Sequence, residues 1–300
     1  MTLVERTLEK MRRAGQKPPE TRPVGALVRE PARPADVVAG AEPETPPKAR
    51  IHIDRDALRA AGYLPETSRD RQFADQYRLI KRPVVAKAFS AAGPHDPSPR
   101  IVMMASALPG DGKTFTSINL AMSLARERDT SVVLIDADVR KPHVTRIFGV
   151  DKEPGLLEAL SDSSADVESL LLPTDMGSLS ILPAGQPAES ATEMLSSARM
   201  AAVVARLLSL NPRRVLLFDS PPLLVSSESR VLAAIAGQIL LVVRSGKTPR
   251  QAVLDAVEEL GEDKEVSLVL NQAHEGHGIY EGYGQYGAYG SNPESDSSSS

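Results

Sequence analysis

The segment with the clearest chemical signature is the loop Ala107-Leu-Pro-Gly-Asp-Gly-Lys-Thr114, which lies between an apolar run and a helical pattern. A phosphate-binding loop has a glycine, four residues and then Gly-Lys-Ser/Thr; Gly112, Lys113 and Thr114 match, and Ala107 replaces the first glycine. Backbone N–H groups of such a loop face a polyphosphate. We expect Lys113 to contact the β- and γ-phosphates and Thr114 to bind Mg²⁺. A glycine-rich turn that only caps a helix is the alternative, and the strand–loop–helix context argues against it.

Carboxylates follow two further apolar runs. One run ends in Asp136-Ala-Asp138-Val-Arg140 and another in Asp219-Ser-Pro-Pro222. In a doubly wound sheet, ligands bind at the carboxyl ends of the strands. Three carboxylates there would repel one another without a cation, and Mg²⁺ accepts carboxylate and phosphate oxygens together. The pattern predicts a magnesium-dependent phosphate site, although each aspartate alone could cap a helix or turn.

Tyrosines gather near the end of the sequence. Four of the six lie at three-residue intervals with glycine between them, at Tyr280, Tyr283, Tyr286 and Tyr289. A packed core does not need this pattern, whereas a flexible protein substrate does, because its hydroxyl must reach a buried phosphate in line. The alternative is a low-complexity aromatic segment that drives weak self-association.

The elements around these groups alternate between strand and helix signals. Helical patterns cover 114–128, 191–210 and 249–260, and short apolar runs cover 101–105, 132–135, 215–218, 239–243 and 266–270. Continuous apolar strands that alternate with helices predict an α/β fold, a doubly wound, mostly parallel sheet with helices on both faces.

Four regions are predicted along the chain. Residues 1–13 form a short amphipathic helix, marginal alone or a docking helix for a partner or a membrane surface. Residues 14–50 are a proline-rich disordered linker, 51–275 are the α/β domain, and 276–300 are a disordered segment rich in Tyr, Gly and Ser.

Composition excludes several classes of function. The net charge of −4 argues against a dedicated nucleic-acid binder. The absence of cysteine excludes disulfides, thiolate metal sites and cysteine nucleophiles. The longest apolar runs are about six residues, whereas a membrane-spanning helix needs about 20, and no signal-peptide core is found near the N-terminus.

The three motifs together resemble those of the bacterial tyrosine kinases (BY-kinases), the autophosphorylating P-loop kinases of exopolysaccharide production, which are similar to ParA/MinD ATPases. The matching segments are Leu108–Thr114, Ile135–Pro142 and Phe218–Pro222, and the resemblance covers about residues 72–275. The chain is most similar to the tyrosine autokinases encoded with exosortase-linked polysaccharide systems. ParA and MinD have a signature lysine at the position of Leu108, and the kinases, like this chain, lack it.

The resemblance implies an ATP:protein-tyrosine phosphotransferase that uses ATP and Mg²⁺. It implies that Lys113, Asp136, Asp138 and Asp219 are catalytic and that Thr114, Asp138 and Asp219 hold the metal. Asp136 is the candidate for orienting and deprotonating the incoming tyrosine, and the four late tyrosines are the autophosphorylation sites. The residues expected to contact the nucleotide are Pro109, Gly110, Asp111, Gly112, Lys113, Thr114, Phe115, Arg140 and Asn271.

A charged helix before the first strand resembles the family's interface motif, Glu-x-x-Arg-x-x-Arg, which joins subunits in a ring. Here Asp75, Arg78 and Lys81 occupy the motif positions and share one helix face. We therefore expect a homo-oligomer, with a solvated charged face as the alternative. Lys81 cannot form the bidentate pair of an arginine, which leaves the size of a ring open.

The resemblance also implies partners and a location. The partners are a membrane chain-length-determinant protein (a polysaccharide co-polymerase) and a protein-tyrosine phosphatase. The expected location is the cytoplasm, with recruitment to the inner face of the plasma membrane by a partner. Two other functions stay open: a ParA/MinD-like ATPase switch without protein kinase activity, and a non-catalytic subunit that only binds nucleotide.

Overall fold

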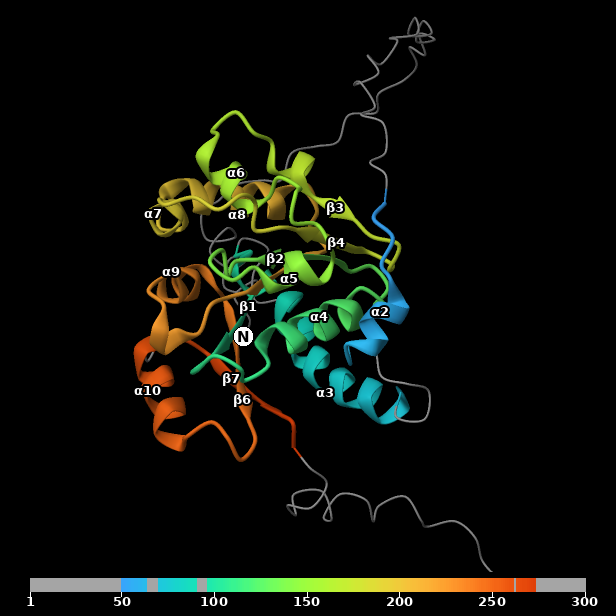
Figure 1. Ribbon diagram of the computed structural model, residues 1–300, viewed down its shortest axis with the longest axis vertical. Helices are drawn as coiled ribbons and strands as arrows, with labels where there is room; N and C mark the ends of the chain where they lie inside the picture. Colours follow the sequence, from blue (N-terminus) through green and yellow to red (C-terminus); the bar gives the residue numbers. More distant parts are fainter. Residues whose placement is uncertain (1–49, 64–69, 91–95, 262, 274–300) are drawn as a thin grey trace, which may run out of the picture. The chain divides into compact units, whose positions relative to one another are not determined.

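A computed structural model describes residues 50–63, 70–90, 96–261 and 263–273 (Figure 1). The side chains of residues 70–72 are outside this description. The helix predicted over 1–13, the linker over 14–49 and the tail over 276–300 also lie outside it, so these remain predictions. Among the described residues, no helix combines the length and the apolar composition needed to cross a bilayer.

The described strands form one seven-stranded sheet in the order β3-β4-β2-β5-β1-β6-β7. Six strands are parallel to their neighbours, and β3 at one edge is antiparallel to β4. The strands are β1 (Ile101–Ser106), β2 (Ser131–Asp136), β3 (Leu172–Pro173), β4 (Leu179–Leu182), β5 (Arg214–Asp219), β6 (Gln238–Arg244) and β7 (Val266–Asn271). The strand order reverses around β1, as the doubly wound prediction requires.

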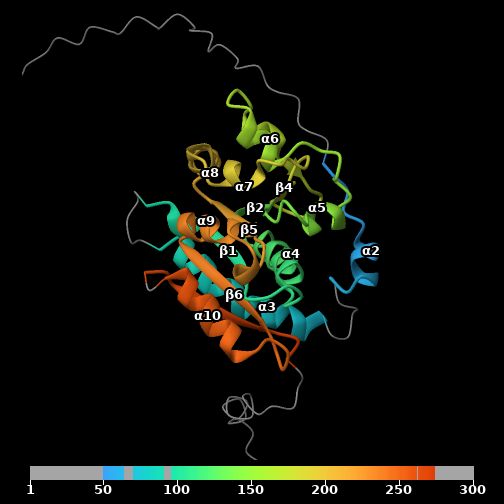
Figure 2. The ribbon, with the colours of Figure 1, turned by 60° about the vertical axis from the view of Figure 1, so that its left-hand side comes forward.

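Helices cover both faces of this sheet. In Figure 1, α3 and α4 lie on one side and α8, α9 and α10 on the other, and Figure 2 shows the sheet from the side of α9 and α10. The α-helices are α2 (Arg55–Ala60), α3 (Asp70–Ala88), α4 (Lys113–Leu124), α5 (His143–Ile147), α6 (Leu156–Ser161), α7 (Ala191–Leu195), α8 (Ala198–Leu210), α9 (Glu228–Ile235) and α10 (Arg250–Leu260). Short 3₁₀ helices are η1 (Ser98–Arg100), η2 (Val167–Leu170) and η3 (Leu223–Val225).

Two hydrophobic cores lie against the two faces of the sheet. Along β1, Met103 packs into the core that contains α8, α9 and α10, whereas Met104 packs into the core beneath α3 and α4. Successive side chains of a strand point to opposite faces, so a strand covered on both sides must be apolar throughout. This explains the continuous apolar runs in the sequence.

One predicted helix is divided in two. The pattern over 191–210 predicts a single helix, but α7 ends at Leu195 and α8 begins at Ala198. The hydroxyls of Ser196 and Ser197 donate to the carbonyls of Thr192 and Met194, at 2.8 and 2.6 Å. Such local bonds compete with the helical pattern and allow the chain to change direction.

The carboxyl ends of the central strands carry the candidate site. Asp136 and Asp219 are register partners at the last positions of β2 and β5, and β1 beside them leads into the phosphate loop. Groups that are distant in the sequence therefore meet at the carboxyl ends of the central strands.

Candidate active site

The phosphate loop connects β1 to the first residue of α4, Lys113. Gly110 and Gly112 have φ angles of +85° and +96°, a conformation that glycine adopts without steric cost. Ala107 is fully buried and does not have a positive φ; among the described non-glycine residues only Asp129 and Gln272 do. Alanine is therefore compatible with the backbone at the first position of the motif.

The side chain of Asp111 braces the loop. It is buried, and its carboxylate accepts hydrogen bonds from the Leu108 N–H at 3.2 Å and from the Thr248 hydroxyl at 2.7 Å. Asn271, at the end of β7, donates from Nδ2 to the Asp111 carbonyl at 2.9 Å. The sequence grouped Asp111 and Asn271 with the nucleotide contacts, and the structure places both side chains against the loop itself.

Replacing Gly112 by alanine is expected to weaken both folding and nucleotide binding. A Cβ there would lie 2.0 Å from Asn271 Nδ2, on a backbone that disfavours side chains. Gly110→Ala is the matched control, because its φ is also positive but no atom lies within 4 Å of the added carbon. We expect G112A to lose about 1 kcal/mol more stability than G110A in thermal unfolding, because the Asn271 side chain must turn away and lose its hydrogen bond to the Asp111 carbonyl. Asn271→Ala should recover part of that loss in G112A; equal losses for the two glycine variants would contradict the clash.

Lys113 is close enough to two buried carboxylates for its charge to act on both. It is 8% exposed, and its charge lowers the pKa of both Asp138 and Asp219. Burial has a larger and opposite effect, so the pKa of each aspartate lies above its ordinary value. The Asp219 carboxylate accepts hydrogen bonds from the hydroxyls of Thr114 and Ser117, at 2.7 and 2.8 Å.

Asp136 is held through one of its two carboxylate oxygens. The N–H and the hydroxyl of Thr145 both donate to Oδ2, each at 2.8 Å. Oδ1 is buried and has no hydrogen-bond partner among the described groups. Burial and the nearby charge of Asp219 raise the pKa of Asp136 to about 8, against the hydrogen bonds from Thr145.

This donor set fits a magnesium ion only together with phosphate. Within the described ranges, no three His, Cys, Asp or Glu side chains are close enough to hold a metal ion by themselves. Mg²⁺ commonly takes one or two carboxylates together with substrate phosphate oxygens. The pKa values of Asp136, Asp138 and Asp219 are all raised, and a bound cation would favour the ionised form of these carboxylates.

Arg140 extends from the same strand end toward α9. Its Nε is 2.9 Å from a carboxylate oxygen of Glu228, whose side chain is 3% exposed. Burial alone would raise the pKa of Glu228, but bonds from the Ser226 and Thr192 hydroxyls and the charge of Arg140 hold it at about 2. The Arg140 side chain itself is 73% exposed, so its guanidinium lies at the solvent edge of the site.

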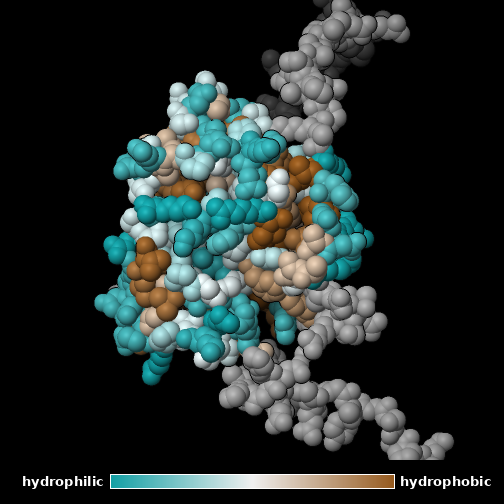
Figure 3. Space-filling model, viewed as in Figure 1, coloured by the Kyte–Doolittle hydropathy of each residue, from teal (hydrophilic) through white to brown (hydrophobic). Residues whose placement is uncertain are grey.

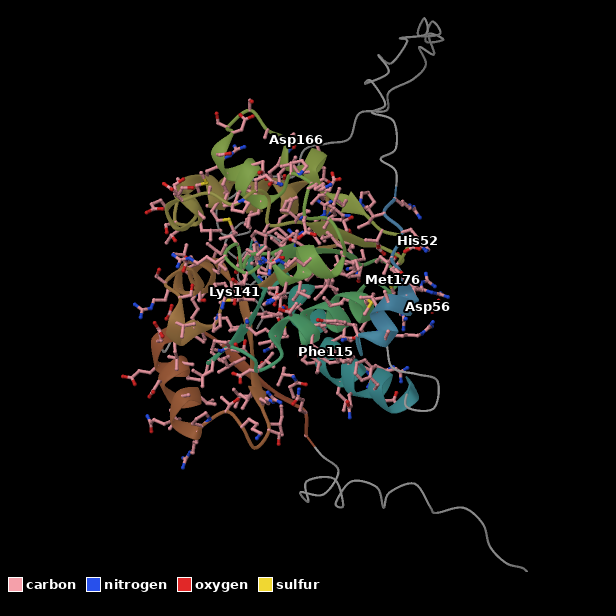
Figure 4. All side chains as sticks on the ribbon, viewed as in Figure 1. His52, Asp56, Phe115, Lys141, Asp166 and Met176 are labelled. Atoms are coloured by element: carbon pink, nitrogen blue, oxygen red, sulfur yellow. The ribbon has the colours of Figure 1, made fainter. Side chains whose placement is uncertain are left out.

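Phe115 belongs to an aromatic cluster outside the loop. Its ring lies 5.5 Å from the ring of Tyr63 and 6.1 Å edge-on from that of Phe73. Figure 4 labels Phe115 on α4, and Figure 3 shows an apolar area over the adjoining part of the surface. The ring therefore joins α4 to the end of α2 and to α3, and its expected nucleotide contact remains a prediction.

The expected interface residues differ in exposure. Asp75 and Arg78 form an exposed ion pair with each other on α3. Lys81 is only 12% exposed and is bound within its own chain, to the Glu127 carboxylate and to the Ser123 carbonyl. A role of these three side chains between subunits remains a prediction.

Four supporting residues were not predicted from the sequence: Ser117, Thr145, Glu228 and Thr248. Ser117 and Thr145 bind the catalytic carboxylates, Glu228 binds Arg140, and Thr248 binds Asp111. A hydroxyl residue in a helix or loop is common. For Ser117 the sequence offers one signal: it lies three residues after Thr114 on the same helix, so the two side chains share a face.

Comparisons with known proteins identify the class and then the family. A family model described as ParA, NUBPL iron-transfer P-loop NTPase, matches residues 98–260. The chain is 31% identical to tyrosine-protein kinase YwqD of Bacillus subtilis, over 69% of this chain and 86% of YwqD. It is 32% identical to the crystal structure of the VpsO kinase domain, with a TM-score of 0.53, over 67% of this chain and 99% of that domain.

The fold and the phosphate loop thus define a ParA-like P-loop NTPase. Within that class, the chain belongs to the bacterial tyrosine kinases, and its enzyme class is protein-tyrosine kinase. The matched family description includes iron transfer, but iron–sulfur clusters are held mainly by cysteine thiolates and this sequence contains no cysteine.

Other relatives are much longer than the matched region. The succinoglycan biosynthesis transport protein ExoP of Rhizobium meliloti is 31% identical over 58% of this chain, but the match spans only 22% of ExoP. The whole activity of such a protein therefore does not transfer to this chain directly.

Proposed function

We propose that this kinase phosphorylates its own late tyrosines, Tyr280, Tyr283, Tyr286 and Tyr289, and does so between neighbouring subunits. The observation that carries the proposal is the convergence of Lys113, Asp138 and Asp219, with Asp136 beside them, at the mouth of the phosphate loop. This set can bind a nucleoside triphosphate and stabilise charge on a transferring phosphoryl group. The glycine-spaced tyrosines offer hydroxyls that can enter such a site.

Each side chain has a proposed role. Lys113 offsets charge on the β- and γ-phosphates, while Thr114, Asp138 and Asp219 hold magnesium directly or through water. Bound magnesium neutralises phosphate charge. Asp136 orients the incoming tyrosine and takes its proton as the phenolic oxygen bonds to the γ-phosphorus and the bond to the departing ADP breaks.

The remaining proposed contacts are with the nucleotide. The loop backbone at Pro109, Gly110 and Asp111 lies against the phosphates, and Asn271 lies at the edge of the nucleotide site. Arg140 is proposed to contact phosphate or a neighbouring subunit through the part of its guanidinium that Glu228 leaves unbound.

The proposed setting is the control of exopolysaccharide length or export. It is supported by the relatives, one of which is named a succinoglycan biosynthesis transport protein. We propose a membrane chain-length-determinant protein as the partner that brings the kinase to the inner face of the membrane, and a phosphatase that resets the tyrosines. Nucleic acid has no place in this proposal.

The test is incubation of the full chain with Mg-ATP, followed by mapping of phosphotyrosine by mass spectrometry. Phosphate on the four late tyrosines is the expected result. ATP hydrolysis without phosphotyrosine would instead favour a ParA-like switch, and nucleotide binding alone would favour a non-catalytic subunit. Either outcome would overturn the proposed autokinase.

Changing the four late tyrosines to phenylalanine is expected to remove nearly all incorporated phosphate. The variant keeps Tyr63 and Tyr77 in the described domain, so residual signal can be assigned. Each phosphate adds nearly two negative charges, so we also expect phosphorylated wild-type oligomers to dissociate and the variant to keep its size in light scattering. Unchanged phosphate incorporation would contradict the assignment of these sites, and equal oligomer sizes with and without phosphate would contradict the regulation.

A further inference from the structure

Thr145 is a buried polar residue with an exceptional position. It lies on the short helix α5, is 2% exposed, and contacts the last residue of β2 and the segment that follows β4. None of the motifs in the sequence includes it. Its contacts with Asp136 therefore need their own explanation.

Thr145 binds Asp136 through two donors, and both donate to the same carboxylate oxygen. Its backbone N–H and its hydroxyl both donate to Oδ2 of Asp136, at 2.8 Å each. The hydroxyl oxygen also accepts a bond from the N–H of Ala184 at 3.0 Å. A hydroxyl that donates on one side and accepts on the other has a fixed orientation, so it cannot turn away.

The two bonds determine which carboxylate oxygen is bound and which is left free. Because both donors hold Oδ2, Oδ1 is left buried and without a partner. Rotation of the carboxyl group would break both bonds at once. The backbone beneath is also fixed, because the Ala137 N–H donates to the Asp219 carbonyl at 2.9 Å.

We propose that Thr145 is a positioning residue that presents Oδ1 of Asp136 to the hydroxyl of the incoming tyrosine. The inference rests on the proposed role of Asp136 in the transfer. A buried oxygen without a hydrogen-bond partner lowers the stability of a folded protein. Such an oxygen is explained when a ligand that binds later supplies the missing partner. Thr145 maintains this arrangement before substrate binds, so the acceptor hydroxyl meets a carboxylate that is already oriented.

The experiment compares Thr145→Val with Thr145→Ser in the full chain. Valine keeps the shape of threonine but removes the hydroxyl. Serine keeps the hydroxyl, and with it the bonds to Asp136 and to the Ala184 N–H. We expect T145V to lower kcat for tyrosine phosphorylation about 10- to 100-fold and to leave the Kd for Mg-ADP within about twofold. T145S should restore kcat to within about threefold of the wild type. In an Asp136→Asn background, T145V should have no further effect on kcat, because the group that Thr145 positions is already disabled.

A structural measurement without nucleotide completes the test. In crystals of T145V, we expect the Asp136 carboxylate to rotate or to occupy two orientations, whereas in T145S it should keep Oδ2 on residue 145. If T145V does not yield folded protein, Thr145→Ala is measured in its place with the same expectations.

The outcomes separate the two proposals. Wild-type chain without phosphotyrosine overturns the proposed function and, with it, this role for Thr145. Active wild type with equal kcat for T145V and T145S overturns only the inference about Thr145. The same holds if T145V weakens Mg-ADP binding with kcat unchanged, lowers kcat further in the D136N background, or leaves the Asp136 carboxylate unmoved.

Discussion

Lys113→Met is expected to reduce phosphotyrosine formation about 1,000-fold or more. The side chain is buried beside Asp138 and Asp219, and its charge lowers the pKa of both carboxylates. Methionine fills a similar volume but leaves these groups without their cation and leaves the transferring phosphate without a counter-charge. Loss of one preorganised electrostatic group commonly costs about 100- to 1,000-fold, and here the same group also serves nucleotide binding.

The control for this prediction is Lys87→Met. Lys87 forms an ion pair with Glu265, which precedes β7 and so lies at the opposite end of the strands from the site. Its loss should leave the rate within about twofold of the wild type, since exposed ion pairs contribute little. Initial rates of phosphate incorporation at saturating Mg-ATP measure both variants. A K113M variant that keeps a tenth of the wild-type rate would contradict the placement of Lys113 at the reacting phosphates.

The central strands could be predicted from the sequence because each is buried on two sides. A strand such as β5 has a continuous apolar run, here residues 215–218, and the carboxylate at its end, Asp219, then stands out. The phosphate loop was equally clear, because a glycine with φ of +96° and a lysine at the helix start are narrow requirements. Strand β3, at one edge of the sheet, and its neighbour β4 have only two and four residues, so their sequence carries no comparable signal.

The supporting side chains of the site could not be predicted for a different reason. Thr145 follows Asp136 by nine residues and meets it only because the chain turns back through α5. The Arg140–Glu228 pair joins the segment after β2 to the first residue of α9, and in the sequence each residue alone resembles an ordinary surface charge. Such pairs depend on the packing of β2 beside β5, a contact that periodicity within either strand does not contain.

Asp136→Asn is expected to lower the rate of tyrosine phosphorylation about 100- to 10,000-fold, while it stabilises the nucleotide-free protein at alkaline pH. In the wild type, burial and the charge of Asp219 raise the pKa of Asp136 from 3.8 to about 8. Because the folded-state pKa lies above the unfolded one, the stability linked to this group is fully present below about pH 4. It is lost as pH rises through about 8 and the buried group ionises. Asparagine does not ionise, so this loss should be absent from the variant.

Thermal unfolding between pH 5.5 and 9, in EDTA and without nucleotide, measures the effect. The wild type should lose stability relative to D136N across this range, by on the order of 3 kcal/mol. The matched comparison is Asp175→Asn. Burial raises the pKa of the Asp175 carboxylate, but the hydrogen bonds from Ile53 and His52 and the nearby positive charges together hold it below its ordinary value. That variant should not remove the alkaline loss. Parallel pH curves for the wild type and D136N would show that Asp136 is already ionised without cost in the folded chain.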